Sequence, residues 1–356
     1  MDHRTNNLDG LRLVGALMVL VGHGFVLVGR AEETPKFGGF SLETLGVVIF
    51  FSISGYLIAA SWASKRDLVA YFAARCLRIF PALAVLVAVT ALVLGPLASS
   101  VGARSYFSDP LTWDYFRNIA LYHQNVLPGV TDDLPYPASI NGSLWTLPME
   151  FVCYLLVPLL VLRDHRFRLA ALLVVVLGLC WVAYQPNGTF DRVWGFAPEQ
   201  FARFAVLFMA GSLIRLAVER WGRGFLRADV AVALLAAHVL VQQVRPDQLH
   251  WYAWLTLPYV VLVVGMGSTP YFRRAARFGD LSYGMYLWAF PVQQLFVLWF
   301  GTTRLAVNFV VVALVTAALA YVSWHVVEKP SLAVKDKILA RRAQRSISRQ
   351  ETVGIP

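Results

Sequence analysis

The first apolar stretch of the chain, residues 8–29, carries ionisable side chains at spacings that place them on one helix face. Arg12 and His23 are eleven residues apart, which in a helix is about three turns plus 20°. Asp9 precedes Arg12 by three residues and joins the same face. At about 1.5 Å per residue, His23 lies about 16 Å further along the helix than Arg12. An imidazole there could accept a proton or act as a nucleophile.

A structural interpretation of the same residues stays open at this point. Arg12 would extend its guanidinium to the inner headgroups, and His23 would hydrogen-bond a neighbouring helix. The glycines that flank His23, Gly22 and Gly24, suit either interpretation. They allow a ligand to approach closely, and they equally allow two helices to pack closely.

A second group is the "RCLR" sequence, in which Arg75 and Arg78 are three residues apart. Side chains at that spacing point the same way in a helix, so two guanidiniums form one patch suited to phosphate groups. The alternative is that both arginines only fix the orientation of the chain in the membrane. Pro81 is expected to bend or restart the helix just inside the membrane.

A third group surrounds Glu150 in "NGSLWTLPMEFVCYL". Glu150 stands about 12 Å inside the apolar run, where a carboxylate must be paired or protonated. Pro148 leaves a backbone carbonyl free nearby, so we expect this segment to line a cavity at a depth comparable with that of His23. The alternative is a buried ion pair with an arginine such as Arg203.

The elements that must position these residues follow from composition. Of 356 residues, 58% are hydrophobic and 15% are charged, where soluble domains carry about 25% charged residues. The fold class is therefore all-α, a polytopic membrane protein of about ten transmembrane helices, the first retained rather than cleaved. The expected spans are residues 8–29, 44–63, 77–98, 143–162, 167–184, 200–218, 228–244, 251–268, 281–300 and 305–327.

Alternate connections are basic, which predicts that they face the cytoplasm together with both termini. The basic segments are "SKRDLVAYFAARCLR", "RDHRFR", "RLAVERWGRGFLR", "YFRRAARFGD" and the sequence after Lys329. We expect one transmembrane domain, residues 1–330, and a basic cytoplasmic tail, residues 331–356. The long outer connection, residues 99–141, is expected to contain a short helix at "TWDYFRNIALYH".

Charge, cysteine spacing and the absence of repeats argue against three other kinds of protein. The net charge of +10 reflects topology and attraction to anionic membrane lipid, so no nucleic acid partner is expected. Cys76, Cys153 and Cys180 lie apart without metal-ligand spacing, and we expect no metal site. No repeat with matching broken helices is evident, which weakens the case for an inverted-repeat transporter.

Several stretches resemble the acyltransferase-3 family of integral membrane O-acyltransferases. In that family an Arg, ten intervening residues and a His form the opening signature, here Arg12 and His23. The resemblance extends from Asn7 to about Pro330. The matching stretches are "NNLDGLRLVGALMVLVGHG", "LGVVIFFSISGYLI", "RCLRIFP", "GSLWTLPMEF", "NIALYHQN", "LSYGMYLW" and "VEKP".

The resemblance implies an enzyme of the bacterial cytoplasmic membrane that takes an acyl group, usually acetyl, from coenzyme A. The acceptor would be a hydroxyl on a sugar of a cell-surface polysaccharide or lipid-linked glycan; some relatives acylate macrolides. Arg12, Arg75 and Arg78 would bind the phosphates of acetyl-CoA. His23 would act as general base or carry the acyl group. Glu150 would be the second catalytic residue, orienting His23 or binding the sugar. The substrate-binding or supporting residues would be Asp9, Ser54, Tyr56 and Trp145.

Two departures from the family pattern bear on this expectation. The family often has a His after "YLW", where this chain has Ala289, so that helix is left out of the catalytic set. An extracytoplasmic esterase-like domain is not expected, so the membrane unit would finish the transfer alone or with homo-oligomer or polysaccharide-assembly partners. Two other functions stay open. One is a proton-coupled transporter or flippase of a glycan intermediate that uses His23 and Glu150, and the other is a silent scaffold.

Overall fold

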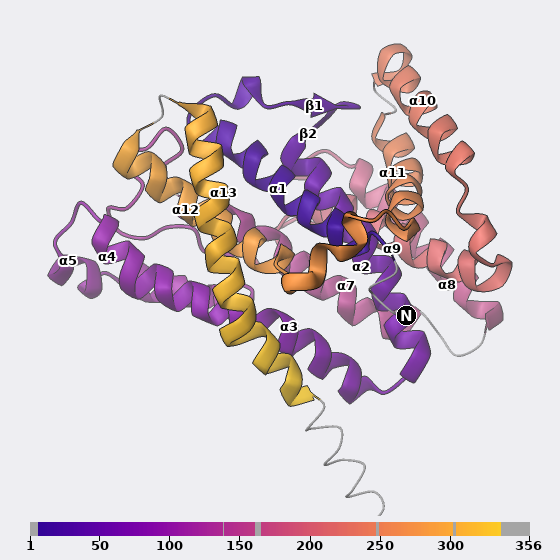
Figure 1. The fold of residues 1–356 in the computed structure, drawn as a ribbon, viewed down its shortest axis with the longest axis horizontal. Helices are drawn as coiled ribbons and strands as arrows, with labels where there is room; N and C mark the ends of the chain where they lie inside the picture. Colours follow the sequence, from indigo (N-terminus) through magenta and orange to yellow (C-terminus); the bar gives the residue numbers. More distant parts are fainter. Residues whose placement is uncertain (1–5, 138, 161–164, 247–248, 302–303, 336–356) are drawn as a thin grey trace, which may run out of the picture.

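The computed structural model describes residues 6–137, 139–160, 165–246, 249–301 and 304–335. The described chain is an assembly of helices with one short hairpin, which confirms the all-α class. Figure 1 shows α1 (Leu8–Leu27) near the middle, with α12 and α13 on one side of it and α10 and α11 on the other. The predicted tail, residues 331–356, lies outside the described residues from 336 onward.

The helices follow the predicted spans closely. Besides α1, the long helices are α2 (Leu42–Lys65), α3 (Leu68–Val89), α7 (Thr146–Leu160), α8 (His165–Tyr184), α9 (Pro198–Trp221), α10 (Ala228–Val244), α11 (Leu249–Met266), α12 (Ser282–Phe300) and α13 (Leu305–Ser323). Short elements complete the described chain: η2 (Ala31–Glu33), β1 (Lys36–Phe37), β2 (Phe40–Ser41), η3 (Thr90–Leu94), α4 (Gly95–Ala98), α5 (Ala103–Ser108), α6 (Pro110–Asp114), η4 (Tyr115–Ala120), η5 (Gly142–Trp145), η6 (Arg223–Phe225), η8 (Phe272–Phe278) and η9 (Trp324–Glu328). The helix expected at "TWDYFRNIALYH" is present as α6 and η4.

Within the described residues, nine helices are long and apolar enough to cross a membrane. The tenth expected span is α12, which forms a helix of 19 residues but is not among those nine. Its polar side chains, including Gln293 and Gln294, are almost completely buried among other helices. A helix that contacts protein on most sides needs less apolar surface than one that contacts lipid, which explains its composition.

The third span begins earlier than the sequence predicts. Asp67 accepts hydrogen bonds from the backbone N–H groups of Val69 and Ala70, so α3 starts at Leu68. Arg75 and Arg78 therefore lie about two turns inside the helix and not at its start. Pro81 stands within continuous helix, so the predicted restart there is wrong.

Glycines set the closest helix contacts. A Cβ on Gly46 of α2 would stand 2.5 Å from the backbone oxygen of Gly15 in α1. A Cβ on Gly55 would stand 1.8 Å from the backbone oxygen of Phe208 in α9. The three helices α1, α2 and α9 thus pack backbone to backbone, in the manner of small-residue membrane interfaces.

Candidate active site

A partly buried network of four charged side chains joins the beginning of α1, α3, the segment before α12 and the end of the last span. Asp280 Oδ2 accepts from Arg12 Nη1 at 3.0 Å and from Arg78 Nη2 at 2.5 Å. Arg78 Nη1 also lies 2.9 Å from Glu328 Oε2. Ser323 donates to the other oxygen of Glu328 at 3.0 Å. Two positive and two negative charges therefore balance one another in this network.

Asp280 is held in its ionised form. Burial by itself would raise the pKa of this carboxyl, but the guanidiniums of Arg12 and Arg78 lower the pKa below its ordinary value. The N–H and hydroxyl of Ser282 donate to its second oxygen at 3.3 and 2.6 Å. Arg12 and Arg78 thus have a fixed counter-ion inside the protein.

Arg75 lies in a different environment, although it is only one turn from Arg78. Its guanidinium carbon is 5.9 Å from the ring centroids of both Tyr71 and Tyr154. In the described part of the chain Arg75 makes no ion pair, and its Nε is buried without a hydrogen-bond partner. Of the three predicted cofactor-binding arginines, Arg75 is therefore the one whose charge is left for an external anion.

Glu150 and Arg75 both contact Tyr154. One of its oxygens accepts from Ser54 Oγ at 2.8 Å and from the Tyr154 hydroxyl at 2.5 Å. The alternative partner, Arg203, instead donates to the backbone oxygens of Ala183 and Gln185. Glu150 also lines a cavity of about 30 Å³. The cavity is lined by Arg12, Val47, Phe50, Phe51, Thr146, Leu147, Glu150, Tyr283 and Tyr286.

His23 is oriented by its own helix. Its Nδ1 is 3.0 Å from the backbone oxygen of Val19, one turn earlier. Because a carbonyl only accepts, Nδ1 must carry the proton, and Nε2 then presents its lone pair. The edge of the Phe290 ring packs against the imidazole, with ring centroids 5.3 Å apart. This is the tautomer that a general base acting through Nε2 requires.

Glu43 is a functional candidate that the sequence interpretation missed. A Cβ on Gly22 would stand 2.3 Å from Glu43 Oε2, so the carboxylate lies directly against the residue before His23. Glu43 Oε1 accepts from Ser41, whereas Oε2 is buried and has no hydrogen-bond partner in the described part of the chain. The carboxylate also interacts electrostatically with His23. The signal in the sequence was an acid opening an apolar span, which also fits a simple helix-dipole effect.

The structure does not bring Glu150 and His23 together. Glu150 contacts Ser54 of α2. His23 of α1 lies beside Glu43, which is also a residue of α2. Ser54 and Glu43 are eleven residues apart, or about 16 Å along α2. The prediction that Glu150 and His23 lie at comparable depths is therefore wrong. Glu150 belongs to the half that contains Arg12, and its predicted catalytic role has no contact with His23 in the described residues.

Three further residues are predicted to support the site: Asp9, Tyr56 and Trp145. Asp9 lines a small recess next to Asp280 and acts electrostatically on Arg12. Tyr56 is fully buried and packs under the guanidinium of Arg215, away from the cavity. Trp145 packs against Phe204, with ring centroids 5.5 Å apart. Of these three, only Asp9 lies at the charged network.

Aromatic side chains separate the cavity from His23. Tyr286 and Phe50 line the cavity, with ring centroids 5.7 Å apart. Phe290, one turn further along α12, reaches His23. The hydroxyl of Tyr286 donates to the backbone oxygen of Ser143 and hydrogen-bonds Thr146 Oγ1 at the cavity wall. The adjacent Ala289 is buried and contributes no polar group.

Comparisons with known proteins agree with the resemblance. A family model described as "Acyltransferase domain" matches residues 5–325. An "O-acetyl transferase" of Shigella phage Sf6 is 31% identical over 92% of this chain and 96% of its own length. "Nodulation protein 10" of Rhizobium leguminosarum bv. viciae is 28% identical over 96% of each chain. The "O-acetyltransferase OatA" of Staphylococcus aureus is 23% identical over 91% of this chain and 56% of its own length. No solved structure matches the chain.

Proposed function

Because this chain belongs to the "Acyltransferase domain" family, we propose that it is an acyl-CoA-dependent O-acyltransferase acting on a sugar hydroxyl. The acyl group is acetyl, as the names of the phage Sf6 and Staphylococcus aureus relatives suggest. The acceptor is a cell-surface polysaccharide or lipid-linked glycan, and the enzyme resides in the bacterial cytoplasmic membrane. The observation that carries the proposal is the hydrogen bond from His23 Nδ1 to Val19, which leaves Nε2 as the basic nitrogen, on the same helix as Arg12 of the charged network.

The donor end of the site is centred on Arg75. Coenzyme A is an anionic nucleotide, and its phosphates require cations that are not already neutralised. Arg12 and Arg78 have Asp280 and Glu328 as partners, while the guanidinium of Arg75 lies between two tyrosine rings and forms no ion pair with any residue that the structure describes. In this proposal Arg75 binds a phosphate directly, and Arg12 and Arg78 hold the surrounding helices in place.

The reaction takes place at His23. The acceptor hydroxyl loses its proton to Nε2 while its oxygen attacks the thioester carbonyl, forming the ester C–O bond. The C–S bond breaks, and the coenzyme A sulfur leaves and takes up the proton as a thiol. Gln293 lies beside the residue that follows His23, since its amide nitrogen would stand 2.4 Å from a Cβ on Gly24. Its Oε1 is buried and has no partner among the described residues, so it could accept a hydrogen bond from a hydroxyl of the acceptor.

The donor must travel between these two regions. A cavity of about 30 Å³ holds one or two water molecules, far less than a pantetheine arm needs. The aromatic wall of Phe50, Tyr286 and Phe290 must therefore move when the donor binds. Rotation of these rings would connect the cavity lined by Glu150 and Arg12 with the imidazole of His23.

The proposal is tested with purified protein in lipid nanodiscs and acetyl-CoA labelled with ¹³C in the acetyl group. Mass spectrometry follows the label in free acetate, on the protein and on added glycan. His325→Ala is a matched control, because His325 Nδ1 also bonds the backbone oxygen one turn earlier, at 2.9 Å, but its ring packs against Tyr321, whereas that of His23 packs against Phe290. The expected result is turnover by wild type and His325→Ala that is lost in His23→Ala. Absence of coenzyme A binding and turnover in wild type would overturn the proposal.

A further inference from the structure

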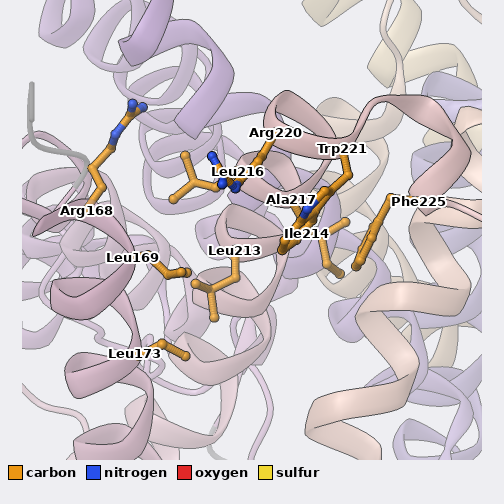
Figure 2. A pocket seen from close by; sticks show the side chains of 10 residues that line it. All are labelled: Arg168, Leu169, Leu173, Leu213, Ile214, Leu216, Ala217, Arg220, Trp221 and Phe225. Carbon is orange, nitrogen blue, oxygen red and sulfur yellow. The ribbon is translucent and has the colours of Figure 1, made fainter. Parts of the chain in front are cut away.

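An apolar groove of about 240 Å³ lies between α8 and α9, away from the candidate active site. Figure 2 shows Leu169 and Leu173 of α8 pointing toward Leu213 of α9, with Arg168 and Arg220 at the same end of the groove. None of the residues that line it also lines the cavity next to Glu150. Its walls are suited to a hydrocarbon chain.

The arginine end of the groove carries a surplus of positive charge. Arg215 pairs with Glu219 at 2.9 Å, and Arg168 reaches the same carboxylate only at 3.8 Å. Arg220 has no ion-pair partner within the described residues. Among the described residues, Arg168 and Arg215 thus share one carboxylate and Arg220 has none, so these four side chains carry a net charge of +2.

Arg168 is the most informative of the three. The residue is only 9% exposed, and its Nε is buried with no hydrogen-bond partner among the residues that the structure describes. Burying a guanidinium N–H without an acceptor is costly, so the position favours an anionic group that enters from the groove. Arg168 and Arg220 occupy the first turn of α8 and the last turn of α9, where membrane helices meet the headgroup region.

The neighbouring aromatic residues fit the same location. Trp221 is exposed next to the groove and stacks on Phe225, with ring centroids 5.7 Å apart. Exposed tryptophan at the end of a membrane helix is typical of the interface between hydrocarbon and headgroups. The groove therefore runs from headgroup level, where the arginines lie, into the hydrocarbon region.

From these observations we infer that the groove binds one anionic diacyl phospholipid. Its phosphate lies between Arg168 and Arg220, and one acyl chain lies along Leu169, Leu173 and Leu213. A zwitterionic phospholipid would fill the same apolar walls but would not neutralise the charge surplus. This inference is independent of the proposed acyl transfer, because it uses neither His23 nor Arg75.

The test is native mass spectrometry of the full chain released from nanodiscs of equal phosphatidylglycerol and phosphatidylcholine. We expect wild type to retain one phosphatidylglycerol in about tenfold preference to phosphatidylcholine. Arg168→Gln/Arg220→Gln should abolish this preference. Arg223→Gln, which removes a nearby charge that does not line the groove, should retain it. Ala217→Phe fills the groove without changing charge and should reduce retention of both lipids.

Three results would overturn the inference. The first is no lipid preference in wild type, and the second is an equal loss in Arg223→Gln, which would indicate diffuse surface charge. The third is displacement of phosphatidylglycerol by an equimolar polyprenyl phosphate, which would assign the groove to a carrier lipid. If the double arginine variant does not fold, Ala217→Phe decides: unchanged phosphatidylglycerol retention in that variant also counts against the groove.

Discussion

Arg78 Nη1 lies 2.9 Å from Glu328 Oε2, although 250 residues separate them in the chain. This contact ties α3 to the end of the last span, and Asp280 extends the connection to α1. The guanidinium of Arg78 also lies over the rings of Tyr283 and Trp324. Arg78 is thus surrounded by groups of its own chain, which makes it a residue that holds the bundle together.

Removing the acid from this contact should destabilise the protein. Glu328→Ala leaves Arg78 with one fewer buried counter-ion, which typically costs about 3–5 kcal/mol. We expect Tm, measured by thermal denaturation in detergent, to fall by several degrees. Glu33→Ala is the control, since it breaks an exposed pair with Arg30 of the kind that contributes about 0–1 kcal/mol. Equal effects of both substitutions would contradict a structural role for the buried network.

Substitution by Gln should affect different properties at Arg75 and Arg78: coenzyme A affinity at Arg75 and thermal stability at Arg78. Arg75→Gln removes a guanidinium with no internal ion pair among the described residues, so Tm should stay close to that of wild type. The dissociation constant for coenzyme A, measured by calorimetry, should rise by about tenfold or more, or about 1.4 kcal/mol. Arg78→Gln should mainly lower Tm. Coenzyme A binding by Arg75→Gln at wild-type affinity would exclude Arg75 as the phosphate ligand.

Helix positions are readable from the sequence because apolar length and charge are local properties. Arg12 and His23 lie in one uninterrupted helix, as their spacing predicts. The partner of Arg12 is Asp280, 268 residues away, and nothing in the local sequence marks such a contact. The depth predicted for Glu150 is counted from the residue at which its apolar run begins. Its actual level depends on how α7 packs against Ser54, which is a tertiary property.

Gly55 should tolerate no side chain. A Cβ there would stand 1.8 Å from the backbone oxygen of Phe208, and a backbone atom cannot rotate away. Ser212 also donates to the Gly55 oxygen at 3.0 Å across the same contact. Gly55→Ala should therefore lower stability by about 1–3 kcal/mol or more, seen as reduced Tm and yield of folded protein. Gly178→Ala, in α8 with no atom within 4 Å of its Cβ position, is the control and should be neutral or stabilising.

The connection between α3 and α7, residues 99–141, should lose stability in mild acid. Burial lowers the pKa of His123 to about 4, whereas an unfolded chain titrates near 6.5. Between those values the unfolded state binds more protons than the folded state, so stability falls as pH falls. Wild type should show a larger drop in Tm from pH 7 to pH 5 than His123→Gln. His325→Gln serves as the control, and equal pH dependence in all three proteins would contradict this assignment.

Glu43 should assist His23 without binding the donor. When Nε2 accepts a proton the imidazole becomes positive, and a carboxylate packed against Gly22 stabilises that charge. Glu43→Gln keeps the size of the side chain and removes its charge, so kcat should fall by about tenfold to a hundredfold. The affinity for coenzyme A should not change, because Arg75 lies in the other half of the bundle, near Tyr154 and Glu150.

A purely structural role for Glu43 makes a different prediction. It would lower Tm in Glu43→Gln and leave the kcat of the folded fraction unchanged. Glu32→Gln, in the exposed segment before the hairpin, controls for loss of negative charge on the same side of the membrane. A selective loss of kcat in Glu43→Gln, with wild-type Tm and donor affinity, would identify Glu43 as the residue that positions and stabilises the catalytic imidazole.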